Sequence, residues 1–521
     1  MLNSLESTAP DMPMRADVAV VGGGLAGLVL ARSLTKLGHY VVVLESGGEQ
    51  QLEEVHPLNE VELTAQRYQG ATEGRFRALG GTSTRWGAAL LPYLHTDLDA
   101  HPCGWHDGWG LNADDLAKYL APLEHDFGIV GGGYEGENRY AHLLPSFLPR
   151  LPKWPAFRKR SISNVYRDSI ASDPRLIIWV NATVTEIKLD MGRVRGLTAK
   201  SDNGHELDIS TTHVAIAAGA IETTRLLLLL DRAHCGRIFT STSPLGQGFH
   251  DHLSAPIAVL NERDRGAIIR LFGFRFTSGG MRNLRFELAP RARAGGGLPG
   301  AFLHVAFSRD NESGFEGLRR FYQAIQRGSP PALTDIGTIL ADLPWFLGAV
   351  WWRFAEKRVL PPTRAQFLLH LVTEQKPDCD NRICLSPTAR DHFGQPRAQI
   401  HWEVRDEDLM HFARIANLAT EEWATGPLAA LAGIMPRPAE IVAQELVNGG
   451  GIYHPAGTTR MGSSAADSVV DSQLRVHGVT GLWSVATSVF PSIGGTSPSL
   501  GLMQFALRAA ENIAVSVARR S

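Results

Sequence analysis

The chain has 521 residues, long enough for two or more domains with an extensive buried core. Its 51 lysines and arginines nearly balance 53 acidic residues, so no charge excess indicates nucleic acid as a partner. Four cysteines are too few for a disulfide scaffold and suit a reducing compartment. Two of them, Cys379 and Cys384, lack the spacing of a zinc motif, so we expect no metal there.

The first 16 residues read as a short polar lead. They lack the basic start, apolar core and cleavage site of a signal peptide. No run of 18 or more apolar residues is present, so we expect no membrane-spanning helix. The sequence therefore favours a cytoplasmic location.

Residues 17–48 have the pattern of a dinucleotide-binding βαβ unit. Gly22, Gly24 and Gly27 have the GxGxxG spacing, and Glu45 follows about 20 residues later. The glycines allow a tight turn, close approach to a pyrophosphate and close packing of helix on strand. The helix N-terminus offers N–H groups to phosphates, and Glu45 can accept hydrogen bonds from a ribose. The expected elements are strand 18–21, helix 25–37 and strand 41–44.

Further elements of this α/β domain follow along the chain. Alternating apolar and polar residues predict a small β meander, and later apolar runs predict a strand and a helix on either side of a glycine turn. We expect helix 109–127 capped by Asn112, meander 176–207 with turns at 190–192 and 202–204, a strand and helix within 213–230, strand 481–485 and helix 500–514.

A second domain interrupts the first, because glycine motifs vanish after residue 254 and return at 449. The fold class is therefore α/β: a discontinuous Rossmann-like domain plus a domain with a largely antiparallel sheet. We predict domain segments 1–254, 255–448 and 449–521, with second-domain strands near 267–290, 300–308, 366–373 and 381–402 and a helical region at 315–358.

Histidines in two loops are candidate functional groups. His454 lies between apolar and glycine-rich sequence, where it is either structural or faces a pocket. His250 and His252 in FHDHLS suggest either a metal site or a structural element. A second helix N-terminus, near residue 500, follows the small-residue loop SIGGTSPS and suits an anion or a cofactor edge.

These motifs, in this order, resemble the glucose-methanol-choline (GMC) oxidoreductase family. Besides the βαβ unit, the resemblance is carried by ALGGTSTRWGAALLP, VAIAAGAIETTRLLL, EQKPDCDNRICLS and the block from HPAGTTRMG to VFP, and it spans residues 17–514. The small residues after VFP, followed by TSPSLGLM, are more similar to the pyranose-oxidase and sugar-dehydrogenase side of the family.

The resemblance implies FAD at the βαβ unit and a substrate domain whose sheet roofs the isoalloxazine. It implies oxidation of a small-molecule alcohol (on a sugar, glycoside or natural product) by hydride transfer to flavin N5, with His454 as the base. The cofactor-binding residues it implies are Gly22, Gly24, Gly27, Glu45, Gly81, Thr82, Ser83, Arg85, Val184, Ala218 and Gly219.

Two departures from the family pattern affect the predicted site. Ser497 stands before Pro498, where the family has Asn or His; it either orients the substrate oxygen, with Thr496 as a neighbouring candidate, or caps the following helix. Arg85 replaces a histidine that bonds covalently to the flavin in some relatives, so we expect non-covalent FAD. Arg85 then either stabilises the reduced flavin or pairs with an acid.

Residues 339–358 cluster aromatic side chains ahead of two basic residues. This segment is a membrane-surface helix, the lid of an apolar pocket or a packed helix. Two alternative functions stay open: a lyase or other non-redox enzyme that keeps FAD, and a membrane-peripheral redox protein. The electron acceptor also stays open among oxygen, a quinone and a protein.

Overall fold

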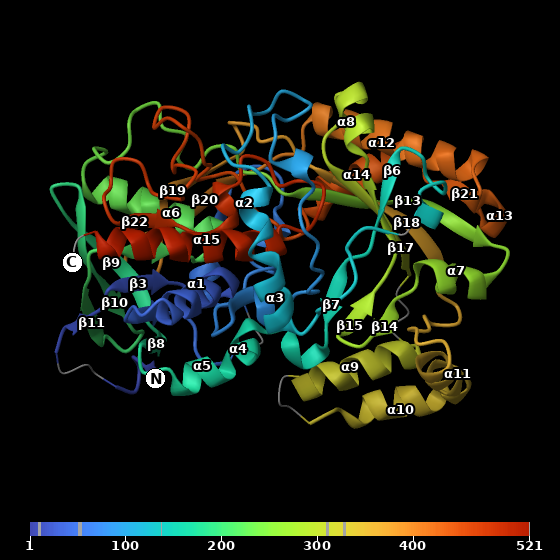
Figure 1. The fold of residues 1–521 in the computed structure, drawn as a ribbon, viewed down its shortest axis with the longest axis horizontal. Coiled ribbons are helices and arrows are strands. Elements are labelled where there is room, and N and C mark those ends of the chain that lie inside the picture. The colour runs from blue at the N-terminus through green and yellow to red at the C-terminus, as the bar shows by residue number, and fades with distance from the viewer. Residues whose placement is uncertain (9–11, 51–54, 137, 309–311, 327–329, 520–521) are drawn as a thin grey trace.

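The computed structural model describes residues 1–521 except 9–11, 51–54, 137, 309–311, 327–329 and 520–521. A parallel sheet with its helices occupies one half of the molecule, and an antiparallel sheet occupies the other (Figure 1). The class predicted from the sequence, a Rossmann-like α/β unit plus a largely antiparallel sheet, is confirmed.

The nucleotide-binding half is built on six strands in the order β1-β8-β4-β3-β12-β22, all pairs parallel. Strands β3 and β4 are buried along their whole length, as is usual for the inner strands of a parallel sheet that is covered on both faces. Helix α15 packs on α1. The bounds are β1 Leu2–Ser4, β3 Val18–Val21, α1 Leu25–Lys36, β4 Val41–Leu44, β8 Leu176–Val180, β12 Val214–Ile216, α6 Gly219–Ala233, β22 Leu482–Ser484 and α15 Ser499–Ala518.

A four-stranded sheet, β2-β11-β10-β9, forms the meander. Both predicted turns are present, but the first predicted strand, β8, belongs to the parallel sheet instead. The helix predicted over 109–127 is divided in two, and its first part begins after Ala113 without a side-chain cap, so Asn112 is not the cap. The bounds are β2 Met14–Arg15, β9 Thr183–Asp190, β10 Arg193–Lys200, β11 Glu206–Ser210, α2 Asp114–Ala117 and α3 Leu120–Phe127.

The second half is built on six antiparallel strands in the order β21-β13-β18-β17-β16-β6. Alternate side chains face opposite sides. One side packs into an apolar core with helix α12, and the other side faces the nucleotide-binding half. The bounds are β6 Phe147–Arg150, β13 His252–Glu262, β16 Arg285–Leu288, β17 Ala301–Phe307, β18 Phe367–Glu374, α12 Asp406–Thr425, β21 Ala432–Pro436 and α14 Ala439–Gly449.

Several second-domain predictions need correction. The region near 267–290, expected to be strand, begins with helix α7, and its strands follow only after Gly273. Strands β19 and β20, expected within 381–402, form a separate sheet in which β20 lies between β19 and β5. The bounds are α7 Arg265–Phe272, β14 Arg275–Thr277, β15 Gly280–Arg282, β19 Arg382–Arg390, β20 Pro396–His401, β5 Glu62–Leu63, β7 Lys153–Pro155, α4 Ile162–Val165, α5 Arg167–Ser172, α8 Pro290–Gly296 and α13 Leu428–Leu431.

The predicted helical region is confirmed as three helices that lie together below the antiparallel sheet in Figure 1. Within the part of the chain that the structure describes, no single helix has the length and apolar character of a membrane span. Helices α10 and α11, bent by 87°, pass that test only as a pair. The bounds are α9 Gly314–Gln326, α10 Leu333–Ala341 and α11 Leu343–Phe354.

Candidate active site

The predicted phosphate-binding glycines meet at the carboxyl edge of the parallel sheet. A Cβ on Gly22 would lie 2.5 Å from the carbonyl oxygen of Ala217, and one on Gly27 would lie 1.9 Å from that of Gly22. A Cβ on Gly81 would lie 2.9 Å from Cα of Gly24. Only glycine therefore allows these backbone segments to approach so closely.

The N-terminus of helix α1, with its first backbone N–H groups, lies at this point. Its N-cap, Gly24, provides no side-chain hydrogen bond, and its first turn carries no acidic residue. The first N–H groups of an α-helix have no partner within the helix, so this end suits a pyrophosphate. The residues present therefore fit a dinucleotide.

Glu45 is buried at the end of β4, beside the glycine turn. Its carboxylate accepts hydrogen bonds from the N–H groups of Gly23, at 2.8 Å, and Gly47, at 2.9 Å. Burial raises the pKa of Glu45, and these two backbone donors oppose the rise. Each carboxylate oxygen keeps a further lone pair, so Glu45 can still accept from a ribose hydroxyl.

Six further residues were predicted to bind the cofactor: three lie on β9 or at the start of α6, and three lie within the segment 82–85. Ala218 and Gly219 begin helix α6 beside Gly22, and Val184 on β9 follows the segment whose Ala182 N–H donates to Glu45 O. Ser83 is used internally, because its hydroxyl donates to Gly80 O and accepts from Ile162 N–H. Thr82 is exposed, and the Arg85 guanidinium lies 5.0 Å from the centre of the Phe76 ring.

His454 lies between α14 and β22, where a buried carboxylate fixes its backbone. Asp251 Oδ1 accepts the N–H of His454 at 2.9 Å and that of His252 at 2.6 Å. Its Oδ2 accepts the hydroxyl of Tyr68 at 2.6 Å. The preceding residue, Tyr453, has a φ of 70°, a left-handed conformation that costs energy for a non-glycine residue and often occurs at functional sites.

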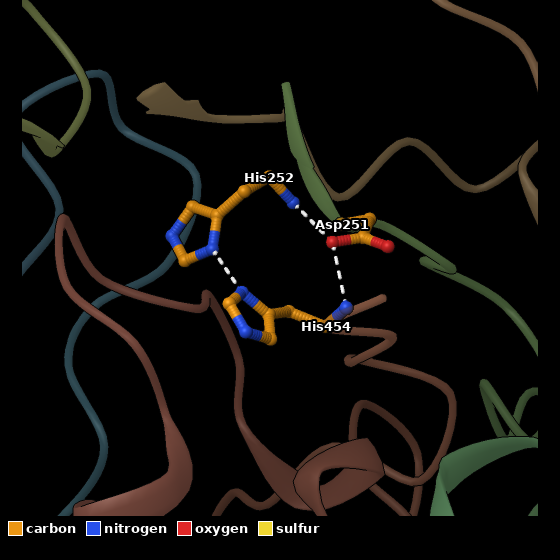
Figure 2. Close-up of side chains that lie close together, drawn as sticks. All are labelled: Asp251, His252 and His454. Atoms are coloured by element: carbon orange, nitrogen blue, oxygen red, sulfur yellow. Dashed lines mark hydrogen bonds between the residues drawn. The ribbon is translucent and has the colours of Figure 1, made fainter. Parts of the chain in front are cut away.

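The rings of His252 and His454 are hydrogen-bonded to each other through their Nδ1 atoms (Figure 2). His252 Nε2 lies 2.7 Å from the carbonyl oxygen of Gly494, which can only accept, so this nitrogen carries a proton. In the neutral ring Nδ1 is then bare, and it accepts from Nδ1–H of His454 at 3.0 Å. Nε2 of His454 consequently carries no proton and has its lone pair free to accept one.

Burial keeps this pair neutral. It lowers the pKa of His454 to about 3, with His252 as a further cause, and it lowers the pKa of His252 as well. His454 is therefore in the basic form at neutral pH. The metal alternative for FHDHLS is less favoured by the same geometry, because the ligand atoms of Asp251 and His252 already hold hydrogen bonds.

A second carboxylate fixes the loop on which His252 rests. Glu374 is fully buried on β18 and accepts the N–H of Gly494 at 2.6 Å. His101 Nε2, at 3.1 Å, and the N–H of Gly300 also bind it. Although burial opposes its charge, these partners and Arg293 hold the pKa of Glu374 well below its ordinary value.

Ser497 lies in the same loop, but it does not cap the helix. Its hydroxyl is 3.4 Å from that of Ser499, and α15 begins after Pro498 without a side-chain cap. Thr496 is buried beside it. Among the described residues, His454 hydrogen-bonds to His252 rather than to Ser497.

Sequence reasoning did not assign roles to three residues of this site. Asp251 and His252 stand in FHDHLS, where only a metal or a structural element was weighed. Glu374 begins the EQKPDCDNRICLS motif, but that resemblance assigned it no role. For Asp251 and His252 the signal was an acid between two histidines, and its meaning depends on which loop faces it.

Known proteins resemble this chain in sequence over nearly its whole length. The family model described as GMC oxidoreductase matches residues 377–506, and the one described as NAD(P)-binding Rossmann-like domain matches residues 20–49. The chain is 25% identical to 6'''-hydroxyparomomycin C oxidase of Streptomyces lividus, over 96% of the chain and 92% of that protein. It is 21% identical to the fructose dehydrogenase large subunit of Gluconobacter japonicus, over 96% and 98%.

Solved structures share the fold. Pyridoxine 4-oxidase from Mesorbium loti has a TM-score of 0.58 at 16% identity, with 95% of this chain and 98% of that chain covered. A variant of Aspergillus oryzae formate oxidase has a TM-score of 0.59 at 18% identity, with 98% and 99% covered.

Together with the glycine cradle and the histidine pair, these matches support membership of the GMC oxidoreductase family. The chain is an FAD-dependent oxidoreductase of CH–OH donors.

We expect an unusual pH profile from the buried base. Because the pKa of His454 is lowered to about 3, its free-base form persists far below the ordinary value of 6.5. The second-order rate constant of anaerobic flavin reduction by an alcohol should therefore stay level from pH 8 to about pH 5. Stopped-flow absorbance measures it, with circular dichroism as the folding control. A decline with a midpoint near 6.5 that persists in Asp251→Asn would contradict the buried, neutral pair, because this variant removes the neighbouring carboxyl, whose pKa burial raises to about 6.

Proposed function

We propose that the enzyme dehydrogenates an alcohol of a sugar, glycoside or natural product, with His454 as the base. The observation that carries this is the hydrogen-bonded histidine pair. The Gly494 carbonyl fixes the proton of His252 on its Nε2, so His454 donates from Nδ1 and its Nε2 is unprotonated. The matched oxidases and dehydrogenase favour redox chemistry over the lyase alternative. When bound, FAD supplies the hydride acceptor.

The residues divide the work as follows. His454 Nε2 takes the hydroxyl proton, while Asp251 holds its backbone and His252 holds its ring. Ser497, at the position before Pro498, orients the substrate oxygen through one hydrogen bond.

We propose that FAD is held without a covalent bond. The support is Arg85, which stands in the motif position of a histidine ligand and cannot form that bond. Acid precipitation of the purified holoenzyme should leave the flavin in the supernatant. A yellow pellet would refute non-covalent binding.

His454→Ala tests the proposed base. The variant should keep FAD but lose roughly 10²–10⁴-fold in the rate of flavin reduction, the usual contribution of a general base. Anaerobic absorbance after mixing with a panel of alcohols and glycosides measures this rate. Ser497→Ala serves as the graded comparison, because one neutral hydrogen bond contributes about 0.5–1.5 kcal/mol. If no alcohol reduces the wild-type flavin, or if His454→Ala is reduced as fast, the proposal fails.

A second proposal concerns α10 and α11, which we propose dock on an anionic membrane surface. Their outer face exposes large apolar side chains, with Leu333 84%, Phe354 74% and Trp351 66% exposed. Two exposed basic residues lie nearby: Arg353 in the last turn of α11, and Lys357 just past its end. Aromatic residues beside basic ones suit the interface of an anionic bilayer.

The inner face of α11 has a different role. Trp345 is buried and donates to Pro361 O, and Trp352 packs against the core of the antiparallel sheet. The packed-helix and membrane-surface alternatives for 339–358 thus apply to opposite faces of one helix. A membrane test must therefore leave Trp345 and Trp352 unchanged.

Co-sedimentation with vesicles tests the docking surface. Wild-type protein should sediment with phosphatidylglycerol vesicles, and the Trp351→Ser/Phe354→Ser variant should stay in the supernatant, because the buried apolar area drives binding. The matched control is Met191→Asn, an exposed apolar residue in the β9–β10 turn whose positive φ suits Asn. Wild-type protein that stays in the supernatant would overturn the proposal.

A further inference from the structure

Strand β16 turns charged side chains toward the active-site loop. Phe286 and Leu288 point into the apolar core of the antiparallel sheet, so Arg285 and Glu287 point to its other face. That face meets the loop that carries Ser497. A Cβ on Gly495 would lie 3.3 Å from Glu287 Oε1.

A small cavity of about 20 Å³ lies at this contact. Its lining includes Arg285 and Glu287 from β16, Phe302 from β17, and Thr496 and Ser497 from the loop. It has room for about one water molecule or a group of similar size. The predicted oxygen-orienting residue thus shares a cavity with three charged side chains, those of Arg150, Arg285 and Glu287.

The charges around this cavity do not cancel. Glu287 forms a buried ion pair with Arg150, and Arg293 is paired with Asp97. The Arg285 guanidinium forms no hydrogen bond or ion pair with any residue that the structure describes; its Nε is buried without a partner.

Arg285 is instead held by aromatic rings. Its guanidinium lies 5.0 Å from the ring centre of Trp154 and 5.4 Å from that of Phe302. Burial lowers the pKa of Arg285 to about 10, so the group remains charged at neutral pH. Contacts with two rings hold the guanidinium in place without neutralising its charge.

We propose that Arg285 binds a carboxylate carried by the alcohol substrate, which makes that substrate a hydroxy acid. A guanidinium matches a carboxylate in planar, two-point geometry, and in a desolvated site this pairing is strong. A substrate amine would be repelled by the unpaired charge. The inference rests on the proposed function, because it takes the cavity beside Ser497 as part of the alcohol pocket.

Carboxylate probes test this binding without turnover. Acetate and benzoate are titrated into the oxidised holoenzyme and followed by the change in flavin absorbance, with acetamide and benzamide as neutral counterparts. In wild-type protein the acids should bind at least tenfold more tightly than the amides. Arg285→Met should remove this preference, and Arg285→Lys should retain part of it, because the charge remains but the fork geometry is lost.

Arg275→Gln is the matched control, since Arg275 is exposed on the nearby strand β14, and it should bind the acids as wild type does. Equal binding of acids and amides in wild-type protein would overturn the proposal and leave Arg285 as a structural partner of the two rings. So would undiminished acid binding by Arg285→Met, or by Arg285→Lys if the Met variant fails to fold. Failure of the proposed function shows separately, as a flavin that no alcohol, hydroxy acids included, reduces.

Discussion

The buried carboxylate of Glu374 is the constraint on which the active site depends. It accepts a hydrogen bond from the N–H of Gly494, and the carbonyl of that same residue accepts one from Nε2–H of His252. A carboxylate buried so completely is stable only if it is fully paired, and His101 and Arg293 complete the pairing. Glu374 and its ion-pair partners, on the opposite side of the loop, thus fix the carbonyl that determines which nitrogen of His252 carries the proton.

The antiparallel sheet separates this polar chemistry from the apolar core. Alternate residues of β16, β17 and β18 enter a core with Trp423 and Phe412 of α12, while their neighbours face the loop of Ser497. Because the period of a strand is two residues, one strand serves both purposes. Stability and recognition are therefore encoded in interleaved positions, and a shift of register by one residue would exchange them.

The histidine pair shows how burial keeps an imidazole neutral. A solvent-exposed histidine has a pKa near 6.5, so it would be partly protonated in a mildly acidic solution. Placing His454 against a second neutral ring disfavours the charged form, and the Asp251 carboxylate is directed at backbone N–H groups rather than at the rings. The carboxylate therefore positions the base without raising its affinity for protons.

The sequence by itself determined the parts whose chemistry is local. The βαβ unit from Val18 to Glu45, the turns of the meander and helix α15 follow from periodicity and glycine spacing, because these elements form from contacts within about 30 residues. His454 was also identified from its motif, although its role remains a proposal. Only the tertiary structure brought His252, Gly494 and Glu374 to it, since these residues come from separate segments and their hydrogen bonds join positions 120 to 242 residues apart. The same reason explains why β8 was assigned to the meander and β13 was missed: strand partners are chosen by burial across the whole chain, and no local pattern specifies them.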